Sequence, residues 1–419
     1  MFGVWQEDTL APIVSWSSTL KLEISFSSSR ENQVVMTQKL RVGILFGGRS
    51  GEHEVSLLSA ASILKAIDRS RFDVVPIGIT KEGRWLGAGD AQNLLDGDNS
   101  AVVRKLRAGD PETTPGAKLL QEGMPTLLAP EPGSQNSAGK AIDVVFPVLH
   151  GTFGEDGTIQ GLFELAGIAY VGSGVLGSAA GMDKDAMKRL FAQAKLPIVK
   201  HVTLLRSAWE KSPRTSIAQI EKTLKYPVFV KPANLGSSVG ISKAHDRKEL
   251  GPALNLAGKY DRKLVVEQGV GGQKSKAREL EVAVLGNDDP KASVVGEIIP
   301  GKEFYDYEAK YLSEGSVPLI PAKLTKVESK TIRAMAVDAF RACDLSGLAR
   351  VDFLMEPDGG KRRIYLNEVN TLPGFTQISM YPKLWEATGI GYTDLITRLI
   401  ELALERHAEK SRTNYSREE

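Results

Sequence analysis

The sequence predicts an α/β fold, because strand-like and helix-like segments alternate along most of the chain. An apolar run at 40–46 ends in two glycines, as a buried strand followed by a tight turn does. Apolar residues then recur with helical spacing over 54–68. Apolar runs at 72–79 and 142–149 predict two more strands, so we expect the first part of the chain to build a mostly parallel sheet.

The rest of the first section is less regular. Residues 87–140 are rich in Gly, Pro, Asp and Ser, which predicts a surface excursion with short elements. A short helix at 161–166 and a strand at 170–174 complete this section.

Two further sections follow the first. The second is expected to contain a helix at 184–194 and strands at 226–231, 239–243 and 264–268. The third combines strands, two helices with an apolar face, and an irregular segment at 302–321. Its strands are predicted at 281–285, 292–299, 348–355 and 363–369, and its helices at 329–342 and 392–406.

Composition limits the possible functions. A chain of 419 residues is long enough for two or three domains. Its 53 Lys and Arg residues nearly balance 51 Asp and Glu residues, which argues against a nucleic-acid-binding protein. The single cysteine, Cys343, excludes an intramolecular disulfide and a cysteine-based metal site. No apolar run approaches the roughly 18 residues of a membrane helix, so we expect a cytoplasmic protein without a membrane partner.

The N-terminal segment differs from the rest. Residues 1–38 show no sustained period of 2 or 3.6 and lack the charged and apolar regions of a secretory signal. Organised sequence begins near Lys39, shortly after Met36. We expect residues 1–38 to be an extension that is disordered or precedes the natural start at Met36, which mass spectrometry of the natural protein would decide.

A hairpin is predicted to place two carboxylates and an amide on one face. The turn-rich loop at 356–361 joins two predicted strands. Asp352 and Glu368 are equally far from Gly360, so pairing sets them side by side, and Asn370 shares the face of Glu368. Such oxygen ligands suit Mg²⁺. A solvated polar face of an exposed sheet explains the same residues, so the hairpin alone does not decide.

A second candidate site is the loop Lys231 to Gly240, with the sequence KPANLGSSVG between two predicted strands. Glycines allow close backbone approach, and successive N–H groups with the hydroxyls of Ser237 and Ser238 can form an anion-binding concavity. Lys231 adds a positive charge for phosphate. The sequence lacks the G-x-x-x-x-G-K-[ST] pattern, and an ordinary turn remains the alternative.

A third group of polar residues follows the first strand. Glu52 and Glu54 start the first helix, where acids are favoured by the helix dipole alone. The segment His150 to Gly157 leaves another strand of the same sheet. Ligands of α/β sheets bind at the carboxyl ends of the strands, so these residues are expected to meet at that edge.

Taken together, these motifs resemble those of the D-alanine–D-alanine ligases, bacterial ATP-grasp enzymes of peptidoglycan precursor synthesis. The motifs are GGRSGEHEVS (47–56), HGTFGEDG (150–157), MDK (182–184), KPANLGSSVG (231–240), YDYEAKY (305–311), ARVD (349–352) and NEVNTLPG (367–374). The resemblance extends over about 40–406. The segment 271–276 is longer than the family's usual turn.

The resemblance implies a Rossmann-like pre-ATP-grasp domain at 39–182 that binds substrate, then a two-lobed ATP-grasp fold. The central lobe would span 183–268 and the C-terminal lobe 269–410, followed by a frayed tail at 411–419. ATP would lie between two antiparallel sheets. The residues implied to bind ATP are Lys184, Lys231, Ser237, Ser238, Glu267, Glu279 and Lys310. The residues implied to bind two Mg²⁺ or Mn²⁺ ions are Asp352, Glu368 and Asn370.

The resemblance also implies a reaction: ATP converts one D-alanine to an acyl phosphate with release of ADP. The amine of a second D-alanine then attacks the acyl carbon and phosphate leaves. Glu54 would hold the first ammonium, supported by Ser237 and Tyr311. Arg350 and the backbone N–H of Gly374 would stabilise the oxyanion. The residues implied to lie near the two substrates are Glu54, His150, Ser379 and Met380.

The segment 302–321 would act as the lid. Its intact 305–311 motif resembles that of the dipeptide-forming enzymes and predicts D-alanine at both positions. The family also implies a homodimer. Another ATP-grasp carboxylate–amine ligase and a non-catalytic nucleotide-binding module remain alternatives, although the complete set of metal-ligand residues argues against the second.

Overall fold

The computed structural model describes residues 39–96, 141–271, 276–299, 317–357 and 362–416. The predicted extension at 1–38 and the residues Tyr305, Tyr307, Lys310 and Tyr311 lie outside these ranges, as does most of the segment 271–276. Among the described residues, three sheets form. No helix in this part of the chain is long and apolar enough to cross a membrane.

The first sheet is parallel except at one edge, as predicted. Its strands are β1 (Leu40–Gly47), β2 (Phe72–Ile79), β3 (Trp85–Leu86), β4 (Val144–Val148) and β5 (Ala169–Tyr170). Their order is β3-β2-β1-β4-β5, and only β3 runs antiparallel to its neighbour. Because the order reverses between β1 and β4, the loops that leave these two strands meet at a topological switch point.

The helices of the first section are α1 (His53–Ala66), α2 (Ala88–Asp96), α5 (Thr158–Leu165) and α6 (Val175–Met182). Helix α2 is one short element of the segment predicted to be a surface excursion with short elements. Ala91 and Leu95 are buried in the core of the first sheet, so this helix has a packed face. The polar residues around them, including Asp90, Gln92 and Asn93, hide that face in a composition count.

The second sheet is antiparallel and has one polar face. Its strands are β6 (His201–Leu205), β7 (Val228–Pro232), β8 (Ser242–Ala244) and β9 (Lys263–Gln268), in the order β6-β9-β7-β8. The helices packed on it are α8 (Arg206–Lys211), α9 (Pro213–Thr223) and α10 (Arg247–Ala257). Val230 and Val266 point toward these helices, so their strand neighbours Lys231 and Glu267 belong to the opposite face.

The third sheet is also antiparallel. Its strands are β10 (Arg278–Gly286), β11 (Lys291–Ile299), β12 (Val317–Leu319), β13 (Gly347–Met355) and β14 (Ile364–Asn370), in the order β12-β11-β10-β13-β14. The strand β12 pairs with β11 and corrects the prediction that 302–321 is irregular to its end. The helices of this section are α12 (Lys326–Ala342), α13 (Met380–Glu386) and α14 (Tyr392–Lys410).

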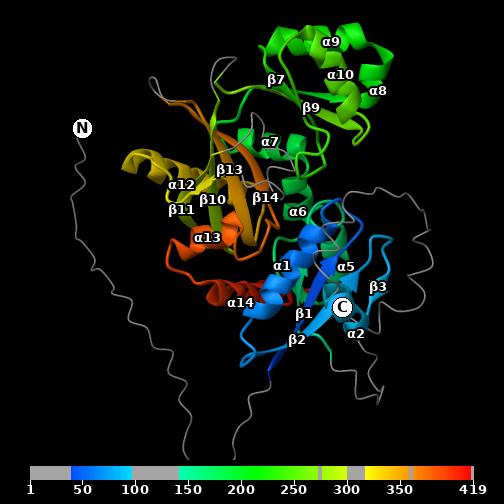
Figure 1. Ribbon diagram of the computed structural model, residues 1–419, viewed down its shortest axis with the longest axis vertical. Helices are drawn as coiled ribbons and strands as arrows, with labels where there is room; N and C mark the ends of the chain where they lie inside the picture. The colour runs from blue at the N-terminus through cyan, green and yellow to red at the C-terminus, as the bar shows by residue number, and fades with distance from the viewer. Residues whose placement is uncertain (1–38, 97–140, 272–275, 300–316, 358–361, 417–419) are drawn as a thin grey trace, which may run out of the picture. The chain divides into compact units, whose positions relative to one another are not determined.

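One face of the third sheet is largely apolar, with the ion pair of Arg278 and Glu297 at one end. Val282, Val351 and Phe353 are buried there against α12 and against α7 (Lys184–Gln193). Figure 1 shows α12 beside this sheet. Helix α7 therefore packs on the third sheet, although the domain division predicted from the sequence assigns its residues to the central lobe. Two fully buried α7 side chains, Met187 and Phe191, make this contact.

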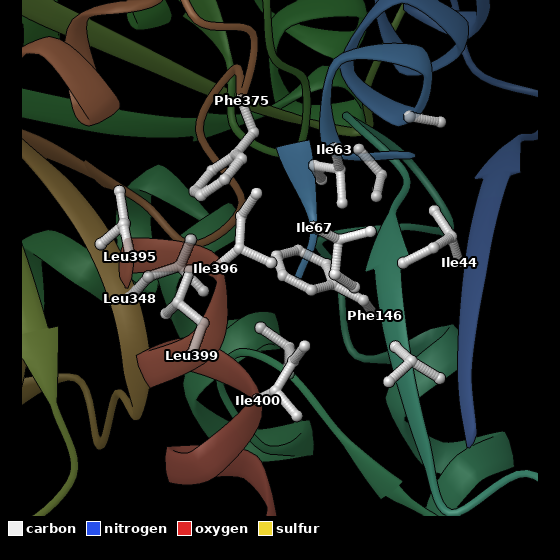
Figure 2. Close-up of a cluster of buried hydrophobic side chains, with 14 of the residues drawn as sticks. Ile44, Ile63, Ile67, Phe146, Leu348, Phe375, Leu395, Ile396, Leu399 and Ile400 are labelled. Carbon is white, nitrogen blue, oxygen red and sulfur yellow. The ribbon is translucent and has the colours of Figure 1, made fainter. Parts of the chain in front are cut away.

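Helix α14 joins the first and third sheets in a common core. Figure 2 shows its residues Leu395, Ile396, Leu399 and Ile400 beside Phe146 of β4. Leu348 of β13 and Phe375 belong to the same cluster, together with Ile44, Ile63 and Ile67 of the first section. All of these side chains are at most 5% exposed, which makes this cluster a main source of hydrophobic stabilisation between the two sheets.

Candidate functional site

The switch point of the first sheet brings together the segments 47–56 and 150–157, which follow β1 and β4. Gly47, at the end of β1, has φ +92°, and a Cβ there would lie 2.1 Å from the carbonyl oxygen of Ile79, so only glycine fits. The chain turns at once into α1, which places the carboxylate of Glu54 in its first turn. Glu54 is 8% exposed and pairs with Lys81.

His150 connects this edge to a distant segment. Its Nδ1 lies 2.9 Å from the carbonyl oxygen of Leu372, and its Nε2 lies 3.1 Å from Ser59 Oγ on α1. A neutral ring with its proton on Nδ1 satisfies both contacts. Burial lowers the pKa of His150 from 6.5 to about 4, against the hydrogen bond to Leu372, which raises it. His150 is therefore neutral at pH 7 and links β4, α1 and the segment after β14.

The loop after His150 contributes a buried acid. The carboxylate of Glu155 lies 4.0 Å from His150 Nδ1. Burial, and the nearby negative charge of Glu52, raise the pKa of Glu155 well above its ordinary value, although Arg350 acts in the opposite direction. Glu52 and Glu155 thus form an acidic pair at the edge of the first sheet.

Helix α7 begins at the site and is capped by the middle residue of the MDK motif. The carboxylate of Asp183 accepts from the backbone N–H groups of Asp185 and Ala186, each at 3.0 Å. This cap fixes the start of the helix, where Lys184 lies. The ammonium of Lys184 is buried and donates to the carbonyl oxygen of Leu235 at 2.8 Å. Burial lowers the pKa of Lys184.

The loop after β7 has an unusual backbone. Ser237 and Ser238 have φ values of 50° and 59°, in the left-handed region that residues other than glycine rarely adopt. The hydroxyl of Ser237 is buried and has no hydrogen-bond partner among the described residues. Two strained residues and one unsatisfied hydroxyl in the same loop are typical of a site that a ligand or another segment completes.

The polar face of the second sheet carries a buried ion-pair chain. Lys231 Nζ lies 2.7 Å from Glu267 Oε2, and Lys188 Nζ lies 2.8 Å from Glu267 Oε1. Burial would raise the pKa of Glu267, but the two ammonium groups outweigh it and hold that pKa well below its usual range. Burial would lower the pKa of Lys231, but Glu267, Glu368 and Glu279 together raise it.

The predicted hairpin forms, with the expected pairing. Asp352 on β13 is directly opposite Glu368 on β14, and the next polar pair is Arg350 with Asn370. The register then shifts, because Phe353 pairs with Leu366 and leaves Asn367 as an extra residue in a β-bulge.

The bulge resolves what the sequence left open about this strand. Leu366 and Glu368 are two residues apart and would share a face on a regular strand. The inserted residue Asn367 lets Leu366 join the apolar core while Glu368 takes the polar face. Val369, 4% exposed, then returns to the core.

Arg350 has close partners on its own sheet. Its Nε and Nη2 atoms donate to the two oxygens of Asp352 at 2.7 Å each, and Nε lies 3.2 Å from Glu281 Oε2 on β10. Asn370 Nδ2 also donates to Asp352, at 2.9 Å. Two carboxylates, one amide and one guanidinium therefore cluster on the polar face of the third sheet.

The segment after β14 carries the last predicted residues. Ser379 precedes α13, which begins at Met380. The backbone N–H of Thr376 donates to Ser379 Oγ at 3.1 Å, and a Cβ on Gly374 would lie 3.3 Å from the same oxygen. Gly374 and Ser379 are therefore neighbours in the segment between β14 and α13.

A small cavity of about 50 Å³ joins several of these groups. It is lined by Glu155 from the first section, Lys184 from α7, Ser237 and Ser238 from the glycine–serine loop, and Glu368 and Asn370 from β14. The structure thus brings together candidates for phosphate and metal binding that are up to 186 residues apart in the sequence, from Lys184 to Asn370. Lys310 and Tyr311 lie outside the described residues.

Two polar residues of the site were missed by the sequence analysis. Lys188 lies one turn after Lys184, on the same helix face as Met187 and Phe191. A lysine on an apolar helix face is the sequence signal that could have identified it. Glu281 alternates with two core residues of β10, which is the corresponding signal in a strand.

The donor set suits a hard cation. Asp352 and Glu368 offer carboxylate oxygens and Asn370 an amide oxygen, on adjacent strands of one polar face. In this structure both Asp352 oxygens accept from Arg350, so cation binding would require these side chains to rearrange. The chemistry of the three residues fits Mg²⁺, and we treat them as its candidate ligands below.

Comparison with known proteins identifies the family of this chain. The model of the D-ala D-ala ligase N-terminus matches residues 41–173, and that of the D-ala D-ala ligase C-terminus matches residues 190–401. The D-alanine–D-alanine ligase of Heliobacterium modesticaldum is 53% identical over 375 residues, covering 89% of this chain and 97% of the relative. That of Bacillus cytotoxicus is 48% identical over 378 residues, covering 90% and 99%.

Solved structures give the same result. The D-alanine–D-alanine ligase from Coxiella burnetii is 34% identical, with a TM-score of 0.69, and the match covers 89% of this chain and 96% of that one. The VanG D-Ala:D-Ser ligase from Enterococcus faecalis is 35% identical, with a TM-score of 0.69, covering 87% and 100%. Both family models and the extent of these matches show that the chain belongs to the D-alanine–D-alanine ligase family.

Proposed function

We propose that this protein joins two D-alanines to D-alanyl-D-alanine at the expense of ATP, as a cytoplasmic enzyme of peptidoglycan precursor synthesis. The family assignment supports the ATP-dependent ligase activity. The single structural observation that supports it most is the cavity lined by Lys184, Ser237, Ser238, Glu368 and Asn370, because it combines phosphate-binding and metal-binding groups.

The nucleotide side of the proposed site combines residues of the second sheet with the start of α7 and the start of β10. Lys184 and Lys231 would contact the phosphates of ATP, and the backbone of Ser237 and Ser238 would close over them. Glu267, Glu368 and Glu279 raise the pKa of Lys231 and so stabilise its charged form, which supports this role. Glu279 would accept hydrogen bonds from the ribose, and Lys310 would add a further charge. Glu267 is already held by two lysines, so its proposed contact with ATP is indirect, through Lys231.

The metal side lies on the third sheet. Asp352, Glu368 and Asn370 would hold Mg²⁺ or Mn²⁺, two ions in the full complex. The ions would neutralise charge on the transferred phosphoryl group. Rearrangement of Asp352 would release Arg350, whose guanidinium would then be available for the reacting carboxyl oxygen.

The substrate side lies at the edge of the first sheet. The buried carboxylate of Glu54 would bind the ammonium of the first D-alanine, supported by Ser237 and Tyr311. The Gly374 N–H and Arg350 would stabilise the oxyanion, and one such donor is typically worth about 2.7–4 kcal/mol. Ser379 and Met380 would contact the second D-alanine. His150 would orient the substrate side without contacting the substrate, because its two ring nitrogens already contact Ser59 and Leu372.

The proposed activity is tested by ATP-dependent phosphate release with D-alanine, with L-alanine as the control. We expect phosphate release and dipeptide formation with D-alanine, and neither with L-alanine. Equal release with both enantiomers, or none with D-alanine, would contradict the proposal.

The second substrate is tested with a panel of D-alanine, D-lactate and D-serine. D-Serine is included because one similar structure is a D-Ala:D-Ser ligase. We expect D-alanine to be preferred at neutral pH, and preferential formation of the depsipeptide or of the D-serine product would refute this.

A homodimer is part of the proposal on family grounds, and sedimentation equilibrium would test it.

A further inference from the structure

Lys188 is an unusual residue in the core of this protein. It lies on the buried stripe of α7 with Met187 and Phe191, and its side chain is 0% exposed. Lysine is almost never fully buried unless its charge is paired, because removing an ammonium from water is costly. The partners of Lys188 therefore indicate why the charge is present.

The first partner is a carboxylate of the nucleotide side. Lys188 Nζ lies 2.8 Å from Glu267 Oε1, while Lys231 Nζ lies 2.7 Å from Glu267 Oε2. One buried carboxylate thus pairs with two lysines, one of which we assign to ATP phosphate. Each oxygen of Glu267 therefore has its own ammonium partner within ion-pair distance, so Lys188 and Lys231 hold the carboxylate from two sides.

The second partner is the bulge of β14. Lys188 Nζ donates to the backbone carbonyl oxygen of Asn367 at 3.2 Å. Asn367 is the inserted residue that turns Leu366 into the core and Glu368 onto the polar face. A bulge residue is left out of the regular ladder, so its carbonyl needs another donor. The adjacent Met187 also contacts this strand, with its sulfur 3.3 Å from the backbone nitrogen of Val369.

We propose that Lys188 is a positioning residue that couples the two halves of the nucleotide site. A single ammonium orients Glu267, and through it Lys231, and also supports the bulge that places Glu368. This inference rests on the proposed function for the identity of the ligands, ATP and Mg²⁺. It assigns to Lys188 an indirect role, without contact to either.

The proposal predicts a selective defect in Lys188→Met, a variant of similar length without the charge. Glu267 would lose one of its two partners and would pair with Lys231 alone, so less positive charge would remain for the phosphates. The bulge carbonyl would lose its donor. We expect KM for ATP and the dissociation constant of ADP with Mg²⁺ to rise about tenfold or more, as for other residues that support a binding site indirectly. We expect KM for D-alanine to change little, because the contacts of Lys188 are with Glu267 and Asn367 and not with the residues assigned to D-alanine.

The experiment combines steady-state kinetics with calorimetric titration of ADP in Mg²⁺. Arg189→Met is the matched control, because Arg189 is the next residue on α7 and its side chain is 69% exposed. Arg189→Met should leave KM for ATP and the dissociation constant of ADP unchanged. The double variant Lys188→Met with Glu267→Gln tests whether Lys188 acts through Glu267. If it does, the effects of the two substitutions on the dissociation constant of ADP are not additive.

Three results would overturn the proposal: ADP affinity and KM for ATP within twofold of the wild type, an equal rise in both substrate constants, or full additivity with Glu267→Gln. If Lys188→Met does not fold, Lys188→Gln retains a neutral donor and should show the same selective defect. Failure of the proposed function is distinguishable, because ADP titration does not require turnover. A wild type that binds ADP but makes no dipeptide would refute the ligase proposal and leave the Lys188 test intact.

Discussion

The first and third sheets place their polar side chains in opposite ways. In the first sheet, Ile44 and Phe46 of β1 belong to one core while Leu45 belongs to another, so this strand is apolar on both faces. Polar candidates such as Glu54 and His150 therefore lie beyond the strand ends. In the third sheet one face is apolar, and the other carries side chains such as Arg350 and Asp352 on the strands themselves.

This difference follows from strand direction. A parallel sheet is usually covered by helices on both faces, and ligands bind at its carboxyl edge. An antiparallel sheet can leave one face polar, because side chains alternate along each strand. In this protein a fixed apolar face therefore determines where the polar candidates point. Substitutions on the two faces of the third sheet should consequently have separable effects.

The largest expected effect is on the apolar face of the third sheet. Phe353→Ala removes a side chain that is 1% exposed and should lower the free energy of unfolding by about 3–5 kcal/mol. The adjacent Leu354, only half-buried, is the control, and Leu354→Ala should cost much less. Urea unfolding measures both. Equal losses would show that the two faces do not differ in packing.

The polar face should show the reverse pattern. Glu368→Gln should lower the rate of phosphate release about 100-fold or more, since a metal ion contributes several kcal/mol of charge stabilisation. The urea midpoint should stay close to that of the wild type, because Glu368 is not part of the apolar cores. Near-normal phosphate release in this variant would show that the metal assignment is wrong.

The edge of the first sheet gives a prediction about pH. The pKa of His150 is lowered from 6.5 to about 4 by burial, so below pH 6.5 the unfolded chain binds a proton that the folded protein refuses. The contribution of His150 to stability is therefore complete above pH 6.5 and decreases as pH falls toward 4, by about 1–3 kcal/mol.

Urea unfolding at several pH values tests this prediction. His150→Gln should make stability less dependent on pH in the window from 4.5 to 6.5. His245→Gln is the control, because the His245 side chain is 49% exposed. Identical pH profiles for the wild type and His150→Gln would contradict the account of a neutral, buried ring.

The smallest expected effect concerns a helix end on the apolar face of the third sheet. Lys195, just after α7, has φ 59°, and the next residue, Leu196, donates its N–H to the carbonyl oxygen of Phe191 at 2.9 Å. This is the geometry that glycine prefers after a helix. Lys195→Gly should raise stability by about 0.5–1 kcal/mol. Ala194→Gly, where the backbone is not left-handed, should lower it, and a thermal melt compares the two.

Much of this fold was predictable where one periodicity continued over several residues. The strands around 40–46 and 348–355 and the long helices α1, α12 and α14 formed near the predicted bounds. The elements α8 to α10 and α13 were missed. Helix α9, for example, buries only Ser216 and Ile220, so its apolar pattern is weak.

The site was predictable to the extent that it depends on local spacing. Pairing across the turn placed Asp352 opposite Glu368, as expected. The bulge at Asn367 was not predictable, because it depends on the core accepting both Leu366 and Val369, which would lie on opposite faces of a regular strand. The ion pairs of Lys188 and Lys231 with Glu267 join residues up to 79 positions apart, and no local pattern reports such contacts. The three-domain division remains a prediction, and α7 packs across it.

A crystal structure with ADP and Mg²⁺ would test the central claim most directly. The account predicts a cation about 2.0–2.1 Å from oxygens of Asp352, Glu368 and Asn370, with the nucleotide phosphates beside Lys184 and Lys231. It also predicts that Arg350 leaves Asp352 in that complex. A nucleotide bound elsewhere, or a cation that does not contact the polar face of the third sheet, would contradict the account.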